Sequence, residues 1–119
     1  MDKDTEPTTV IFRKESGGDI LAVFPYEIYD TNGNMATCYA HVGQHSGCDW
    51  GYITKKTTPA TPAEYADLKR ELESLGYLLE VRQRRQYRQW RQAYEAMLDN
   101  RRQAEITRQD VRDFLAGVK

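Results

Sequence analysis

Long hydrophobic runs are missing from this sequence. The longest uninterrupted apolar stretch is Ile20 to Phe24, whereas a helix needs roughly 20 apolar residues to cross a bilayer. The first residues, MDKDTEPTT, are polar and acidic where a secretory signal would be basic and then apolar. We therefore expect a cytoplasmic protein with no membrane partner.

Cysteines and the short motifs of catalysis are equally scarce. The chain has 2 cysteines, Cys38 and Cys48, which we expect to stay reduced in the cytosol. It has no GxGxxG, P-loop or HExxH motif. Cys48, His45 and Asp49 have the residue types of a nucleophilic relay, but a relay needs each group to be positioned by the fold. We expect neither an enzyme nor a bound cofactor.

Zinc is the one metal for which the sequence contains a cluster of suitable ligand types. Cys38, His41, His45 and Cys48 follow one another closely, and zinc needs four such ligands that converge as a tetrahedron. The positions of Cys38 and His41 differ by an odd number within a predicted strand, so their side chains should point to opposite faces. We therefore expect no metal.

The charge of the chain is distributed unevenly, although its net value is only −1. Residues 1–76 contain 7 Lys and Arg against 12 Asp and Glu, a net charge of −5. Residues 77–119 contain 10 against 6, a net charge of +4, and nearly all of these cations are arginines. With 119 residues, the chain is long enough for one core only.

Residues 61–76 have the clearest local structure, an amphipathic helix with both ends marked. Thr61 is a good N-cap, Pro62 suits the first helical position, and Glu64 completes a capping box. Gly76 can adopt the left-handed conformation that ends such a helix. The apolar stripe predicts a buried face made of Tyr65, Leu68, Leu72 and Leu75.

Strand patterns lie on both sides of this helix. Strands are predicted near residues 10–14, 20–24, 37–42 and 77–82, with turns at 16–19 and 30–34. Residues 20–24 are apolar at every position, which favours a central strand covered on both faces, or one whose outer face is covered by the C-terminal region. Residues 43–58 are expected to be a loop, with a short edge strand at 52–54. In the strand at 37–42, the small side chains of Cys38, Ala40 and Val42 are expected to face the helix.

After residue 82 the sequence predicts two further helices. The first carries an aromatic stripe that includes Tyr87, Trp90 and Tyr94. The second is expected to begin at Thr107 as N-cap and to bury Val111, Phe114, Leu115 and Val118. The prediction is thus an α+β fold, an antiparallel β-sheet in strand–strand–strand–helix–strand order with one helix packed on it and a C-terminal two-helix extension. Residues 1–8 would be a flexible tail, 9–82 the domain, and 83–119 an extension packed on the domain or on a second copy.

Three segments carry a resemblance to known sequences: TVIFRK near the start, AHVGQH at 40–45, and TPAEYADLKRELESLGY at 61–77. They resemble small uncharacterised proteins of gut Bacteroidales and their mobile elements, over roughly residues 8 to 85. The resemblance implies a compact α+β fold and no assigned activity. The region after residue 85 looks like an addition to the shorter members.

The arginine series is the leading candidate for a binding surface. On a helix, Arg84, Arg88, Arg91 and Arg102 would fall within about a 60° sector, with Arg85 further round. Guanidinium groups in such a row suit phosphates or an acidic protein surface. Glu95 and Asp99 lie beside the row, so a solvated helix face with ion pairs is the alternative interpretation.

A ligand pocket is a weaker candidate. His41, His45, Trp50 and Tyr52 lie close together in the sequence and have the side chains to hold a planar ligand. The alternative is that Trp50 closes one end of the core, because large aromatic residues most often serve packing.

Three functions remain open from the sequence. The first is a non-enzymatic accessory protein of a mobile element or phage that docks onto another protein, as an inhibitor or otherwise, with a homodimer as an added option. The second is a nucleic-acid-binding module that uses the arginines. The third is a nucleotide sponge or enzyme with the pocket near His41, His45 and Trp50. Overall acidity favours the first, since nucleic-acid binders usually carry a basic surplus.

Overall fold

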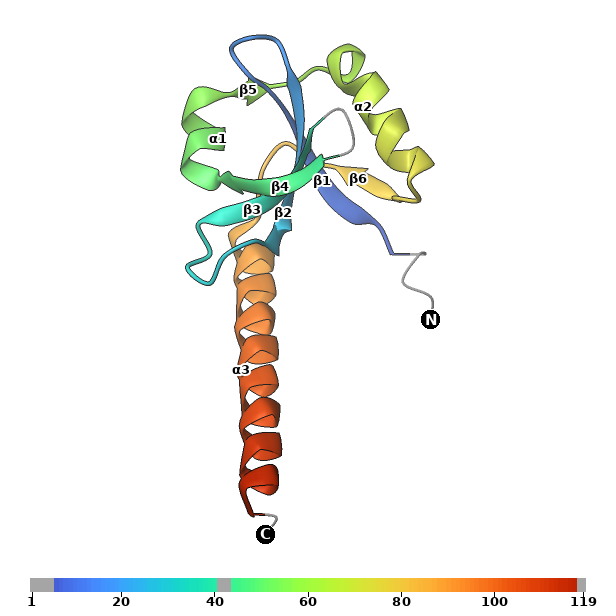
Figure 1. The fold of residues 1–119 in the computed structure, drawn as a ribbon. Coiled ribbons are helices and arrows are strands. Elements are labelled where there is room, and N and C mark those ends of the chain that lie inside the picture. Colours follow the sequence, from blue (N-terminus) through green and yellow to red (C-terminus); the bar gives the residue numbers. More distant parts are fainter. Residues whose placement is uncertain (1–5, 41–43, 118–119) are drawn as a thin grey trace.

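A computed structural model describes residues 6–40 and 44–117 and confirms the α+β class (Figure 1). The elements, in chain order, are β1 (Thr8–Lys14), β2 (Ile20–Ile28), β3 (Met35–Ala40), β4 (Gln44–Asp49), α1 (Trp50–Lys56), β5 (Thr58–Pro59), α2 (Pro62–Ser74), β6 (Leu79–Val81) and α3 (Tyr87–Gly117).

The sheet has the strand order β4-β3-β2-β1-β5, and all neighbours along this path are antiparallel. The expected antiparallel sheet is therefore confirmed. β6 adds one parallel pairing, with Thr8 opposite Leu79 and Val10 opposite Val81. β5 pairs with the other end of β1, through Arg13 and Lys14. β1 thus has β2 along one edge and two short strands along the other.

The two predicted turns form as the glycines require. Gly18 and Gly33 both have positive φ, at 97° and 75°, a region that glycine adopts without steric cost. Pro25 does not end β2, which continues to Ile28, but the register with β3 shifts between Phe24 and Ile28. The strand therefore departs from regular pairing just after the proline, as its missing N–H leads one to expect.

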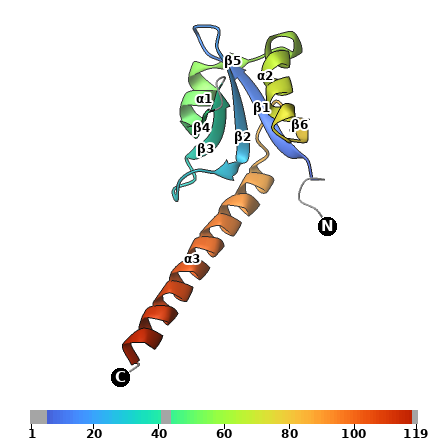
Figure 2. The ribbon, with the colours of Figure 1, turned by 45° about the vertical axis from the view of Figure 1, so that its right-hand side comes forward.

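One face of the sheet packs against α2 (Figure 2). Alternate side chains of β1 and β2 point this way because successive residues of a strand face opposite sides. Tyr65 stacks on Phe12 with ring centroids 4.3 Å apart. The buried residues of this layer are Val10, Phe12, Ala22, Phe24, Tyr39, Ala60, Leu68 and Leu72.

The opposite face of the sheet packs against α1, which makes the domain three layers thick (Figures 1 and 2). Its buried residues are Ile11, Leu21, Val23, Ala36, Cys38 and Ile53, with Cys48 and Trp50 against them. One expectation is corrected here. Cys38 faces α1 and not α2, because Tyr39 is the neighbour that faces α2.

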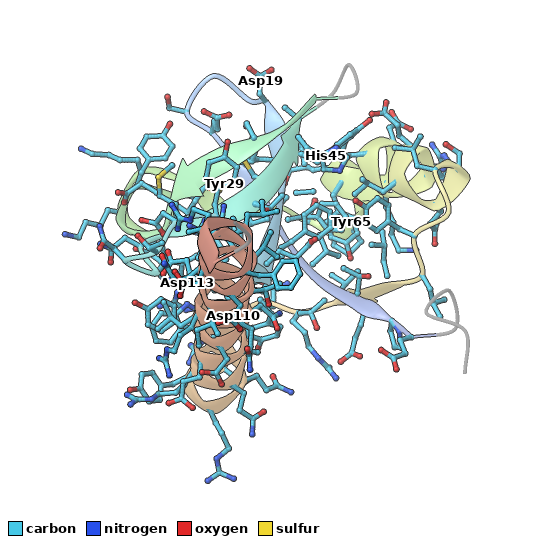
Figure 3. All side chains as sticks on the ribbon, turned by 60° about the horizontal axis from the view of Figure 1, so that its bottom comes forward. Asp19, Tyr29, His45, Tyr65, Asp110 and Asp113 are labelled. Carbon is cyan, nitrogen blue, oxygen red and sulfur yellow. The ribbon has the colours of Figure 1, made fainter. Side chains whose placement is uncertain are left out.

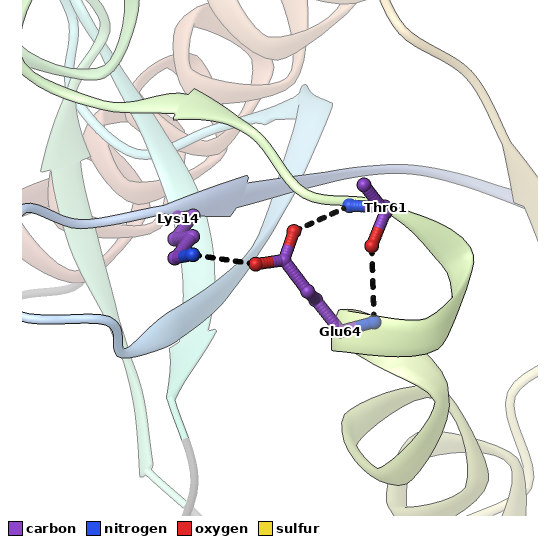
Figure 4. Close-up of polar contacts among 3 residues, drawn as sticks. All are labelled: Lys14, Thr61 and Glu64. Atoms are coloured by element: carbon purple, nitrogen blue, oxygen red, sulfur yellow. Dashed lines mark hydrogen bonds and ion pairs between the residues drawn. The ribbon is translucent and has the colours of Figure 1, made fainter.

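The predicted helix at 61–76 is confirmed as α2. Thr61 is the N-cap and accepts from the backbone N–H of Glu64, while Glu64 Oε1 accepts from the backbone N–H of Thr61 at 2.9 Å (Figure 4). Leu68 and Leu72 are buried as expected. Leu75 is not, because it is the C-cap and is 58% exposed, and Gly76 follows with a φ of 104°.

The expected loop at 43–58 is wrong within the described residues. The segment forms β4, which pairs with β3 over its whole length, and then helix α1. Asp49 is the N-cap of α1 and its side chain accepts from the backbone N–H of Tyr52. Residues 52–54 are therefore helical and not an edge strand, while His41, Val42 and Gly43 lie outside the described residues.

The two helices expected after residue 82 are one continuous helix, α3, of 31 residues. Thr107 lies inside it and caps nothing, because the preceding residues are already helical. α3 leads away from the sheet, and the molecule measures 65 × 32 × 28 Å along its principal axes (Figure 1).

The burial of Leu72 gives a stability test. Leu72 is fully buried under α2, so Leu72→Ala should lower the free energy of unfolding by about 2–5 kcal/mol. Leu75→Ala is the matched control in the same helix, since Leu75 is largely exposed and should cost less than about 0.5 kcal/mol. Urea denaturation followed by circular dichroism measures both. Equal losses in the two variants would contradict the packing of α2.

The capping box gives a pH test. Lys14 Nζ lies 2.6 Å from Glu64 Oε2 (Figure 4). This contact lowers the pKa of the Glu64 carboxyl from 4.5 to about 2, and the hydrogen bond from the Thr61 backbone N–H makes the second largest contribution. A lowered folded-state pKa adds stability that is complete above the unfolded pKa and is lost as the pH falls towards the folded one. The difference in Tm between wild type and Glu64→Gln should thus be constant above about pH 5 and shrink below it. Gln keeps the capping oxygen, so the variant removes mainly the charge. A difference that stays constant from pH 7 to pH 3 would contradict this assignment.

Candidate functional site

The arginine series does not form one helical row. α3 begins at Tyr87, so Arg84 and Arg85 lie in the connection between β6 and α3. Only Arg88, Arg91 and Arg102 of the five candidates belong to the helix. The periodicity argument assumed that the helix began earlier, and this assumption is corrected.

Arg85 lies between two tryptophans. Its guanidinium carbon is 4.3 Å from the centroid of the Trp50 ring and 4.8 Å from that of Trp90. Such stacking attracts the cation to the negative faces of both rings. Partial burial lowers the pKa of Arg85, a sign that the guanidinium has lost part of its hydration. Arg85 therefore joins α1 to α3 and is not a free cation on a helix face.

Tyr26 of β2 holds the first turn of α3. Its hydroxyl accepts from the backbone N–H of Gln86 at 2.9 Å and donates to Gln89 Oε1 at 2.8 Å. The first N–H groups of a helix have no partner within the helix, and here a side chain from the sheet supplies an acceptor just before the first turn. The helix therefore starts where β2 can reach it.

Gly33 provides the second anchor of α3. A Cβ at this position would lie 2.9 Å from a ring carbon of Trp90 and 3.0 Å from the Tyr94 ring, so only glycine lets these rings approach. Trp90 and Tyr94 stack with centroids 5.3 Å apart, and the Tyr94 hydroxyl donates to the carbonyl of Thr31 at 2.6 Å. The turn between β2 and β3 is thus a cradle for the aromatic stripe of α3.

The three arginines on α3 differ in their partners. Arg91 Nε bonds Glu95 at 2.9 Å and an Nη bonds the Tyr87 hydroxyl, and Arg102 pairs with Asp99 at 3.6 Å. Arg88 has no ion pair in the part of the chain that the structure describes. Two of the three are therefore engaged along the helix, which matches the solvated face considered as the alternative.

The residues of the expected ligand pocket are not brought together. His45 lies on the α2 side of the sheet, where its Nε2 is 2.9 Å from the Tyr77 hydroxyl and its ring contacts Tyr39 edge-on (Figure 3). Trp50 lies on the α1 side, against the other core layer. Tyr52 is exposed and donates to Glu15. His41 is outside the described residues.

The two cysteines meet across β3 and β4. Cys48 Sγ donates to the carbonyl of Ala36, and Cys38 Sγ lies 3.4 Å from Ser46 Oγ. A hydrogen bond with Cys48 lowers the pKa of the Cys38 thiol, and both cysteines are free thiols. Among residues 6–40 and 44–117, no group of three His, Cys, Asp or Glu side chains is placed to hold a metal ion.

The far half of α3 is exposed at every position that the structure describes from Asp99 onward. Phe114 and Leu115 are 72% and 64% exposed, and Val111 is also open to solvent. The sequence analysis correctly predicted that these residues form one apolar face of a helix, but it expected this face to be buried. Val118, the last of that set, lies outside the described residues.

Comparison with protein-family models, with curated proteins and with solved structures finds no match to this chain. Within the described part of the chain, no helix is long and apolar enough to cross a membrane.

The stacking of Arg85 can be tested against its neighbour. Arg85→Gln removes a cation held between two indole rings and should lower the free energy of unfolding by about 1–2 kcal/mol. Arg84→Gln removes the same charge one residue earlier and should change it by less than about 0.5 kcal/mol. Thermal unfolding and tryptophan fluorescence of the two variants measure the effect. Equal stability of both would show that the stack contributes nothing.

Proposed function

We propose that this protein is a non-enzymatic accessory protein that docks onto another protein through the far half of α3. The observation that carries the proposal is the exposed apolar stripe on a helix that projects from the domain (Figures 1 and 2). Exposed apolar patches of this kind mark interaction sites in soluble proteins. Ala104, Val111 and Leu115 fall within about 40° of one another on the helix, and Phe114 borders them.

The charges beside this stripe favour an acidic partner. Arg101, Arg108 and Arg112 follow one border of the stripe within about 40°, and Glu105 lies just beyond them. Thr107 and Gln103, on the other border, are uncharged, and Asp110 lies just beyond Gln103. Complementary charges around an apolar centre set the orientation of a complex and its rate of formation. The partner we propose therefore offers an apolar groove with carboxylates along one rim.

Self-association through this stripe receives no support from the charges. An antiparallel pair of α3 helices would place one arginine border against the other, because symmetry brings like borders together. A parallel pair would place the three arginines against Thr107 and Gln103, and Asp110 just beyond them could compensate only one of the three charges. A different protein is thus a better partner for the stripe than a second copy of this chain. If that protein needs its groove for its own activity, docking of α3 would inhibit it.

The test pairs two charge-introducing variants of the same helix. Leu115→Glu places a carboxylate in the stripe, whereas Ile106→Glu places one on nearly the opposite face, at a side chain that is also exposed. Cross-linking pull-downs from the native host should recover a partner with wild type and Ile106→Glu and lose it with Leu115→Glu. Because neither side chain is buried, both variants should keep the wild-type Tm.

Light scattering of the purified chain separates the remaining outcomes. A dimer that Leu115→Glu converts to a monomer would assign the stripe to a second copy. Binding to duplex DNA at physiological salt, abolished by Arg88→Glu with Arg91→Glu, would favour the nucleic-acid module instead. Equal recovery of every partner with Leu115→Glu and Ile106→Glu would overturn docking through this stripe.

A further inference from the structure

A cavity of about 450 Å³ opens between α1, β1 and the connection that leads into α3. Three arginines line it, Arg13 from β1 and Arg84 and Arg85 from the connection. They come from positions up to 72 residues apart, which only the fold brings together. Among the residues that the structure describes, no aspartate or glutamate lines the cavity.

The positive charges around this cavity have no negative partner in the part of the chain that the structure describes. Arg13 donates to neutral acceptors at the end of α1, to the Thr57 carbonyl at 2.7 Å and the Thr57 hydroxyl at 2.9 Å. Arg85 stacks between Trp50 and Trp90, and Arg84 forms no ion pair with a described residue. A partly buried cation without a counter-ion is costly. A bound anion would offset that cost.

Much of the remaining wall of the cavity is apolar. Ile11, Ile53, Pro59 and Trp50 line it, together with the polar side chains of Thr54 and Gln83. A volume of a few hundred Å³, mostly apolar walls and a few convergent charged groups are typical of small-molecule sites. A phosphate monoester carries a charge between about −1.5 and −2 at pH 7. A guanidinium group can donate two parallel hydrogen bonds to the oxygens of such a phosphate.

We propose that this cavity binds a phosphate monoester that carries a ring, a molecule of the size of a mononucleotide. The phosphate lies against Arg84 and the exposed side of Arg13 and Arg85, and the ring lies against the apolar wall. The site is separate from the stripe on the far half of α3 and does not depend on it. It is also separate from His45, which lies across the sheet.

Isothermal titration calorimetry of the full chain tests the proposal with adenosine monophosphate and phenyl phosphate as probes. Both should bind, whereas adenosine and inorganic phosphate should each bind at least about tenfold more weakly, because each keeps only one half of the ligand. Arg84→Gln should lower the affinity for both phosphate esters by about tenfold, because one charge-assisted hydrogen bond is lost. Arg84 is exposed and forms no ion pair within residues 6–40 and 44–117, so this variant should remain folded.

Arg88→Gln is the matched control. It removes the same charge from an exposed arginine on the first turns of α3 that does not line the cavity, and it should change the affinity by less than about twofold. Failure of both phosphate esters to bind at 5 mM would overturn the proposal. So would equal weakening by Arg84→Gln and Arg88→Gln, which would indicate general attraction to a basic region, and so would adenosine binding as tightly as its phosphate.

Discussion

The structure depends on a stretch of β2 that has no side facing water. Along β2, Ala22 and Phe24 point to one face of the sheet, and Leu21 and Val23 to the other, and all four are buried. Because strand side chains alternate, a fully apolar strand creates two hydrophobic faces that both need a cover. α2 supplies one cover and α1 the other. A two-layer domain would leave Leu21 and Val23 in contact with solvent, so the third layer follows from this strand.

Local signals explain which elements were predictable from the sequence. The capping box of Thr61 and Glu64 lies within four consecutive residues, and so α2 could be predicted at both ends. α1 has no such strength, because WGYITKK includes a glycine and two β-branched residues that disfavour helix. It is fixed by Asp49 at its start, by Ile53 in the core and by Arg13 at its end. The contacts of Ile53 and Arg13 are non-local, which is why the segment was predicted to be a loop.

Non-local contacts also explain why the candidate sites were not predicted correctly. The arginine row required a helix that began before Arg84, but Tyr26 sets the start of α3 from another strand. His45 and Trp50 are close in sequence and lie on opposite faces, because His45 points from β4 towards the α2 side, whereas Trp50 begins α1 on the other side. Arg13, which completes the cavity, lies 71 residues before Arg84. Spacing along the chain indicated none of these relations.

The anchoring of α3 bears on how its two ends relate. Arg85, Gly33 and Tyr94 hold the near half against the domain, so the far half projects from it as an arm that is already helical, and a segment that is already folded loses less entropy on binding. The cavity lies at the base of that arm. A ligand in the cavity alters docking only if it binds more tightly when α3 is in one position than when α3 is in another. Arg85 is the group through which that difference would act, because it contacts Trp90 of the helix and lines the cavity at once. A ligand held by Arg84 and Arg13 alone would leave the arm unchanged, and the two sites would then be thermodynamically independent.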